Sequence, residues 1–135
     1  MANEAVIIEL LGEPKGHAIR HTVADGTGIA KGTLLKLTDP RTAVATSADN
    51  DAFGGIAAAE KTASDGVTNL GAFTFGIFDL KATAAGITVG ERVSIGGANT
   101  ISKVAAADLL FSDVGIALET FSASEVGAVL VGSGF

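Results

Sequence analysis

Two histidines, His17 and His21, are the residues of this chain best suited to acid–base or metal chemistry. They stand four positions apart, a spacing that brings side chains together on a helix but separates them by roughly 13 Å along a strand. Gly16 and the strand-like sequence on either side favour a strand, so we expect two separate imidazoles at the surface or at a sheet edge. Nucleophilic catalysis also needs a base and an orienting acid within reach, and the sequence singles out no such set.

The acidic run Asp49-Asn50-Asp51 offers the oxygen ligands that calcium prefers. An EF-hand loop places Asp or Asn at alternating positions, followed by a glycine and a later glutamate. Phe53 occupies the third of these positions, so the pattern fails and we expect a solvated turn. The chain has no cysteine, which rules out a disulfide or a thiolate metal site. We therefore predict no metal and no other cofactor.

The glycines Gly26, Gly28 and Gly32 superficially suggest a phosphate-binding loop. The dinucleotide fingerprint needs G-x-G-x-x-G between a strand and a helix, whereas here the last interval is one residue too long and strand-like sequence follows. We expect these glycines to serve turns. Paired carboxylates for glycoside hydrolysis stay open, although no pair stands out and the chain has no Trp or Tyr to stack on a sugar. The sequence therefore predicts a protein that is not an enzyme.

The composition narrows the class of protein further. A chain of 135 residues fits a single domain, residues 1–135. Its net charge of -6 and scattered Lys and Arg argue against nucleic-acid binding. Hydrophobic residues make up 47% and the mean hydropathy is +0.46, which indicates either an Ala-rich core or a surface that a partner covers. The chain has no apolar run long enough for a membrane span and no signal-peptide pattern at its start.

Gly, Asn and Asp punctuate the chain every few residues, the rhythm of short strands and tight turns. We predict an all-β fold, mainly antiparallel, in the form of a small β-barrel or sandwich with at most one short helix. The best place for a short helix or helical turn is 105–111. The expected strands cover residues 6–11, 18–23, 33–38, 41–46, 53–60, 67–70, 71–81, 87–95, 100–104, 115–119 and 126–131.

The longest expected strand is apolar on both faces. Phe73, Phe75 and Ile77 would share one face, and Phe78 and Leu80 the other. A strand of this kind is either central in a sheet or part of an interface. We therefore take Phe73, Phe75, Phe78 and Leu80 as candidates for a buried oligomer interface, with a place in the core as the alternative.

The sequence contains an internal echo. Residues 28–32 (Gly-Ile-Ala-Lys-Gly) recur as residues 86–90 (Gly-Ile-Thr-Val-Gly), and residues 55–57 (Gly-Ile-Ala) recur as residues 115–117. Repetition at a fixed spacing indicates duplicated structure. It predicts two similar β units packed into one barrel or sandwich, unless Gly-Ile-x-x-Gly is only a common entry to a β-turn.

Several segments, spread over nearly the whole chain, consist mostly of residues that favour turns between short strands. They are Thr22–Thr42, Phe53–Lys61, Asp65-Gly66 with Leu70-Gly71, Gly76–Lys81, Ile87–Gly90 and Gly115–Thr120. Taken together and in this order, they resemble the capsid decoration (cement) proteins of tailed phages.

The resemblance implies a virion structural protein, made in the host cytoplasm, that stabilises a phage head. Such a protein binds the outer capsid surface after expansion, with the major capsid protein of an HK97-type shell as its partner. It is expected as a homotrimer at local threefold positions, where three linked contacts strengthen attachment. It has no catalytic residues, and neither nucleic acid nor a membrane is among its partners.

Residues 1–6 precede the first firm strand, and we expect them to form a flexible N-terminal arm. The candidate capsid-contact residues in it are Ala2, Asn3, Glu4, Ala5 and Val6. Two other classes stay open. One is another minor phage component, such as a head fibre base or a tail accessory protein. The other is a small β-barrel enzyme, which would need a pocket that holds His17 or His21 beside Asp25.

Overall fold

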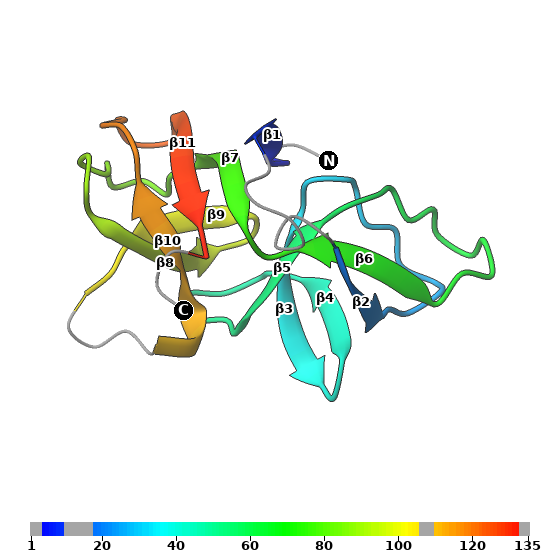
Figure 1. Cartoon of the computed structure of the whole chain (residues 1–135). Helices are drawn as coiled ribbons and strands as arrows, with labels where there is room; N and C mark the ends of the chain where they lie inside the picture. Colours follow the sequence, from blue (N-terminus) through cyan, green and yellow to red (C-terminus); the bar gives the residue numbers. More distant parts are fainter. Residues whose placement is uncertain (1–3, 10–17, 106–109, 133–135) are drawn as a thin grey trace.

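The strands of this chain form two sheets that lie side by side (Figure 1). The computed structural model describes residues 4–9, 18–105 and 110–132. It confirms the predicted all-β, mainly antiparallel fold. Within the described ranges there is no α-helix. In the segment 105–111, where a short helix or helical turn is expected, the described residues begin a single 3-10 turn, η1 (Leu110–Ser112), and residues 106–109 lie outside the described ranges.

The first sheet is a closed five-stranded barrel with the strand order β2-β4-β3-β5-β6. Closure comes from β2, which pairs antiparallel with β6 and parallel with β4 at Thr22 and Thr42. The strands are β2 (Ile19–Thr22), β3 (Leu34–Asp39), β4 (Thr42–Ala45), β5 (Phe53–Ala57) and β6 (Asn69–Phe73).

The second sheet has six strands in the order β1-β7-β11-β10-β8-β9. The first strand of the chain lies at its edge and pairs only with β7. A parallel bridge between Ala82 and Ile101 brings the end of β7 beside β9. The strands are β1 (Val6–Glu9), β7 (Gly76–Lys81), β8 (Arg92–Gly97), β9 (Thr100–Lys103), β10 (Asp113–Ala117) and β11 (Val126–Val131).

The two sheets are copies of one pattern, which we call the first unit (residues 18–73) and the second unit (residues 76–132). β3 and β8 start at positions 34 and 92, β4 and β9 at 42 and 100, and β5 and β10 at 53 and 113. Gly32 and Gly90 take φ values of 89° and 88° in the same turn, a left-handed backbone that glycine adopts without strain. The predicted duplication is therefore real, but each unit forms its own sheet instead of sharing one barrel.

Apolar side chains fill each unit and continue across the contact between them. One cluster lies inside the barrel of the first unit. A larger cluster fills the second unit and includes Leu34 and Ile56 of the first. The rings of Phe73 and Phe78, one from each unit, have centroids 6.2 Å apart. The units are thus joined by a shared hydrophobic core.

Two expected strands are interrupted by turns. The strand predicted at 71–81 is divided into β6 and β7 at Thr74 and Phe75, and Gly76 follows with a φ of 152°. The strand predicted at 87–95 begins only at Arg92, because the turn at Gly90 intervenes. Phe73 and Phe78 therefore belong to different strands.

Candidate functional site

The outward side of the second sheet carries unusually many apolar side chains. Along β7, Phe78 and Leu80 are buried, so the alternation of a strand turns Ile77 and Asp79 outward. Along β11, Val129 and Val131 are buried in the same way. The alternate residues of this strand, Val126, Ala128 and Leu130, therefore face outward.

The pairing of the strands places these residues in rows. Ile77 lies opposite Leu130, which lies opposite Ile116 of β10. In the next row, Asp79 lies between Val6 of β1 and Ala128. Leu118 continues this row beyond Ala128, because its amide donates a hydrogen bond to the carbonyl of Ala128 at 2.9 Å.

We call this surface the outer face. Four large apolar side chains on it are strongly exposed: Val6 (58%), Ile8 (52%), Leu118 (42%) and Val126 (53%). Contiguous apolar surface of this kind marks sites where soluble proteins bind partners. It is the best candidate for a functional site among the residues that the structure describes. The outer face comprises Val6, Ile8, Ile77, Asp79, Ile116, Leu118, Val126, Ala128 and Leu130, and Lys81 of β7 and Arg92 of β8 lie at its margin on the same side of the sheet.

One carboxylate lies in the middle of the outer face. Burial among the apolar neighbours of Asp79 raises its pKa above the ordinary 3.8, and the negative charge of Glu119 raises it further. A carboxylate that has lost part of its hydration costs free energy in the folded chain. Its retention among apolar neighbours gives a partner a charged group to recognise in the middle of this face.

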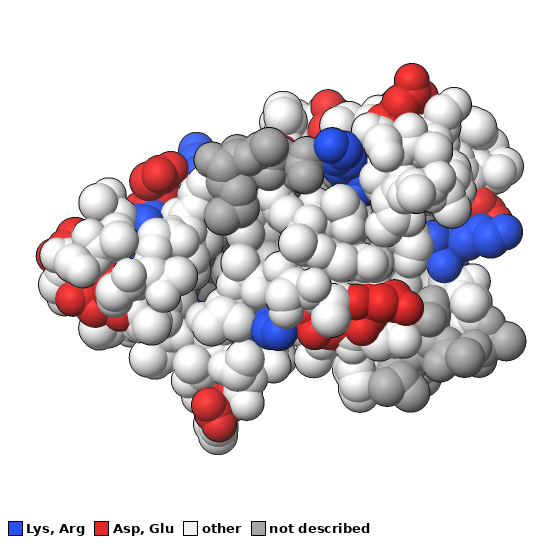
Figure 2. Space-filling view, turned by 180° about the vertical axis from the view of Figure 1, so that it is seen from behind, with Lys and Arg blue, Asp and Glu red and all other residues white. Residues whose placement is uncertain are grey.

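Charge elsewhere on the surface is dispersed. Figure 2 shows the molecule from behind, with Lys, Arg, Asp and Glu in small separate groups and wide uncharged areas between them. This agrees with the scattered basic residues of the sequence. No described helix is long and apolar enough to cross a membrane.

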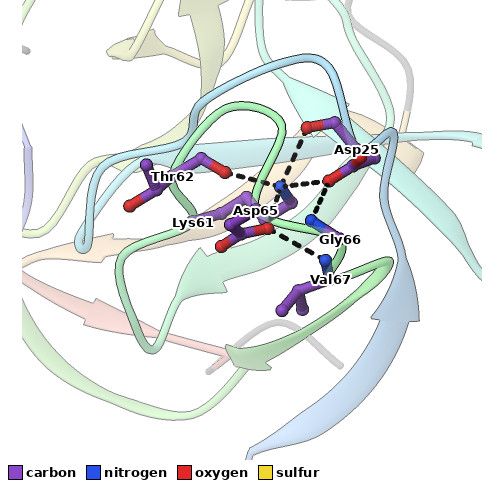
Figure 3. A network of polar contacts seen from close by, with 6 residues as sticks. All are labelled: Asp25, Lys61, Thr62, Asp65, Gly66 and Val67. Carbon is purple, nitrogen blue, oxygen red and sulfur yellow. Dashed lines mark hydrogen bonds and ion pairs between the residues drawn. The ribbon is translucent and has the colours of Figure 1, made fainter.

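A lysine that sequence reasoning did not single out, Lys61, is buried and only 2% exposed. Its ammonium group lies 2.7 Å from Asp65 Oδ1, 2.7 Å from the Thr62 carbonyl and 2.9 Å from the Asp25 carbonyl (Figure 3). Asp25 Oδ1 lies 3.3 Å away and also accepts from the amide of Gly66. The network therefore links the loop that contains Asp25 to the loop that contains Asp65.

The hydrogen bonds of this network determine the charge states. Burial alone would lower the pKa of Lys61, but its bonds to Asp65 and Asp25 outweigh burial and raise it. The bond from Lys61 in turn lowers the pKa of Asp65. A hollow of about 290 Å³ borders Lys61 and Gly28. Because the ammonium is already surrounded by oxygen acceptors, it is not available to a phosphate, and the nearby glycines serve turns as predicted.

Of the two histidines, the structure describes only His21. His17 lies outside the described residues. His21 is on a strand, as expected, but the prediction of a surface position is wrong, because its ring points into the barrel and is 6% exposed. Its Nε2 lies 2.8 Å from the carbonyl of Gly54. It borders a hollow of about 130 Å³ with Arg20 and Arg41, whereas Asp25 contacts Lys61 instead.

The acidic run at 49–51 forms the expected turn. Asp51 accepts hydrogen bonds from the amides of Ser47 and Ala48 at 2.7 and 2.9 Å. Burial would raise the pKa of Asp51, but these amides and the nearby Lys36 lower it below 3.8. No group of three or more His, Asp or Glu side chains suited to a metal is found in the described part of the chain.

The four aromatic and aliphatic residues predicted for an oligomer interface occupy different environments. Phe78 and Leu80 are 0% and 1% exposed and belong to the core of the second unit, which is the alternative that the sequence left open. Phe73 is half-buried and packs against the same core. Phe75 is half-buried in the connection between β6 and β7. A role for Phe73 and Phe75 in self-association stays a prediction.

The expected N-terminal arm is only partly described. Ala2 and Asn3 lie outside the described residues, and Glu4 is half-buried. The amide of Ala5 donates to the carbonyl of Gly32 at 2.6 Å, and Val6 pairs with Asp79. Ala5 and Val6 thus have fixed positions in the structure, and contact between this segment and a capsid stays a prediction.

Comparisons with known proteins give a likeness in structure. No protein-family model matches the chain, and a search of curated proteins finds no match. Among solved structures, the chain is similar to the N base of the head fibre protein gp8.5 in bacteriophage phi29, with a TM-score of 0.54. The two proteins share a fold. The likeness covers 84% of this chain and 92% of that chain, at 13% sequence identity, and therefore concerns the backbone arrangement.

Proposed function

We propose that this chain is a structural protein of a tailed-phage virion that binds the outer surface of the expanded head. The observation that carries the proposal is the fold, which matches the base of a phage head fibre over 84% of the chain. The resemblance of the sequence to phage cement proteins points to the same kind of particle. The role proposed is that of a decoration protein, a homotrimer that stabilises the head through contacts with the major capsid protein.

The outer face fits the self-association in this role, because a rigid β module with an exposed apolar face binds a further copy without large rearrangement. Three such modules in one trimer bind a repeated lattice with linked contacts, so modest single contacts give tight attachment. Expansion of a head presents such a lattice.

A second candidate is the base of a head fibre, which the similarity to the phi29 protein favours directly. In that role the chain would anchor a further structure and would not mainly stabilise the shell. The two roles differ in copy number, because decoration proteins occupy an icosahedral head in hundreds of copies.

Co-sedimentation tests the proposal. The purified chain is mixed with expanded, undecorated heads of the phage that encodes it, and with unexpanded procapsids as a control. Saturable binding to expanded heads alone is expected, and the saturation ratio gives the copy number. Stabilisation of the heads against heat or chelators then separates a decoration protein from a fibre base. Absence of binding to either particle would overturn the proposal.

A further inference from the structure

The duplication provides a template for how a second molecule can be bound. In the first unit, Leu34, Ile56 and Phe73 lie on the outside of the barrel, where Leu34 pairs with Ile56 and Ile56 with Phe73. Leu34 and Ile56 are nevertheless only 1% and 0% exposed. They are covered by the second unit, whose core cluster includes them.

The hairpin β8–β9 of the second unit makes this contact. Asn99, at its tip, accepts a hydrogen bond from the amide of Leu34 at 2.8 Å and donates its own amide to Thr46 Oγ1 at 2.8 Å. The carbonyl of Ile95, on β8, accepts from the amide of Asn50 at 3.2 Å. Asn99 and Ile95 are 5% and 0% exposed.

The equivalent surface of the second unit has no such cover within the described chain. Arg92, Ile116 and Leu130 of the second unit correspond to Leu34, Ile56 and Phe73, because they pair in the same order. Ile116 and Leu130 belong to the outer face and stay partly exposed. Nothing within the described chain repeats the cover that the first unit receives.

The equivalent hairpin is also unoccupied. The hairpin β3–β4 of the first unit corresponds to β8–β9, with Arg41 in the place of Asn99; their φ values are 51° and 55°. Figure 1 shows this hairpin projecting away from the body of the chain. Leu37 stands where Ile95 stands in the second unit, yet it is 42% exposed.

We infer that the outer face binds the first unit of a second copy of this chain through that copy's β3–β4 hairpin. The contact would repeat between two molecules the packing that already joins the two units within one. It buries Leu37 of one copy against Ile116, Leu118 and Leu130 of the next. The inference rests on the self-association included in the proposed function and names the surfaces that produce it.

A contact of this kind joins two different surfaces, so it is head-to-tail. Head-to-tail contacts close into rings when the rotation between copies allows it. A ring of three copies would place six similar units around one axis, each covered by its neighbour. This arrangement produces a trimer from contacts between two different surfaces, so neither surface needs to be complementary to itself.

Charge substitutions at exposed positions test the inference with little risk to folding. Leu37→Asp alters the hairpin, Leu118→Asp alters the outer face, and Val67→Asp is the matched control, an equally exposed valine (46%) outside both surfaces. Oligomeric mass is measured by sedimentation velocity over a range of concentrations, and circular dichroism checks folding. Burying an unpaired carboxylate in the contact is expected to weaken association at least about a hundredfold. Val67→Asp should assemble like the unmodified chain.

A mixing experiment then distinguishes head-to-tail contact from any symmetric one. Leu37→Asp keeps an intact outer face, and Leu118→Asp keeps an intact hairpin. Each variant alone should be monomeric, whereas their mixture should form a one-to-one dimer and no trimer. Variants that still assemble alone, or a mixture that stays monomeric, would overturn the inference.

The outcomes also separate the inference from the proposed function. An unmodified chain that binds expanded heads but is monomeric at all concentrations removes self-association and this inference, and leaves head binding in place. A trimer that resists both substitutions removes the inference alone. Failure to bind heads by a chain that assembles as described removes the head-binding role alone.

Discussion

The side chain of Asn99 offers the most direct test of how the two units are joined. It is buried, stands in a left-handed backbone conformation and accepts the amide hydrogen of Leu34 from the other unit. Asn99→Gly keeps the backbone conformation but removes the acceptor. The Leu34 amide is then left in a buried position without its partner.

The expected cost follows from these contacts. A buried donor that loses its acceptor costs about 1–3 kcal/mol, so Asn99→Gly should lower the free energy of unfolding by this amount. Asn99→Ala loses the same acceptor but keeps a Cβ at a φ of 55°, so it should be less stable than Asn99→Gly by roughly 1–2 kcal/mol, because glycine relieves this strain. For a chain of this length, each kcal/mol corresponds to roughly 4 °C in Tm.

The duplication supplies a matched control. Arg41→Gly changes the equivalent turn, which is exposed and takes no part in the contact between units. It should alter stability by no more than about 0.5 kcal/mol, and it shares the entropic effect of a new glycine. Urea unfolding of all variants measures the differences. If Asn99→Gly and Arg41→Gly had equal effects, the reasoning about Leu34 would be refuted.

Three further substitutions test other parts of the structure. Gly115→Ala places a Cβ against the carbonyl oxygen of Leu130 and should destabilise the chain by at least about 2 kcal/mol in urea unfolding, whereas Gly26→Ala has open space and should be neutral. Asp79→Asn should raise Tm at pH 7, because the raised pKa of Asp79 means that its negative charge disfavours the folded state. The gain in Tm should shrink as the pH falls through that pKa towards 3.8, and a gain that does not change with pH would contradict this explanation. Lys61→Met should lower Tm, because it leaves buried acceptors unpaired. The raised pKa of Lys61 means that the difference from the unmodified chain declines as the pH rises above 10.5, and the lowered pKa of Asp65 means that it also declines as the pH falls below 3.8, which thermal scans at several pH values would show.

Much of the fold was predictable because the residue types that favour turns mark where the strands end. Gly32 and Gly90 stand where the backbone needs a positive φ, and their spacing revealed the duplication. The division at Thr74 and Phe75 was not predictable, since an apolar strand such as 71–81 has the same alternation whether or not it bends. The closing of the first unit into its own barrel depends on pairing between β2 and β6, which are far apart in sequence.

The candidate site was less accessible to sequence reasoning. The run Val126–Val131 is apolar at nearly every position, and the rule applied to the longest predicted strand holds for it too: apolar side chains on both faces indicate a central strand or an interface. Burial of one face only, with the other left open, is a property of the assembled sheet. The Lys61 network was signalled weakly by Asp65 four residues later, but Asp25 joins it only through the fold.

The connection at Thr74 and Phe75 has a consequence for the newly made chain. All strands of the barrel precede residue 74, so the barrel can close on the ribosome while Leu34, Ile56 and Phe73 are still bare. Two extended residues span only about 7 Å, so the strands that follow are held against that bare surface as they form. Nascent chains with exposed apolar surface tend to aggregate or to exchange domains with one another. The short tether makes each chain cover its own barrel before a neighbour reaches it.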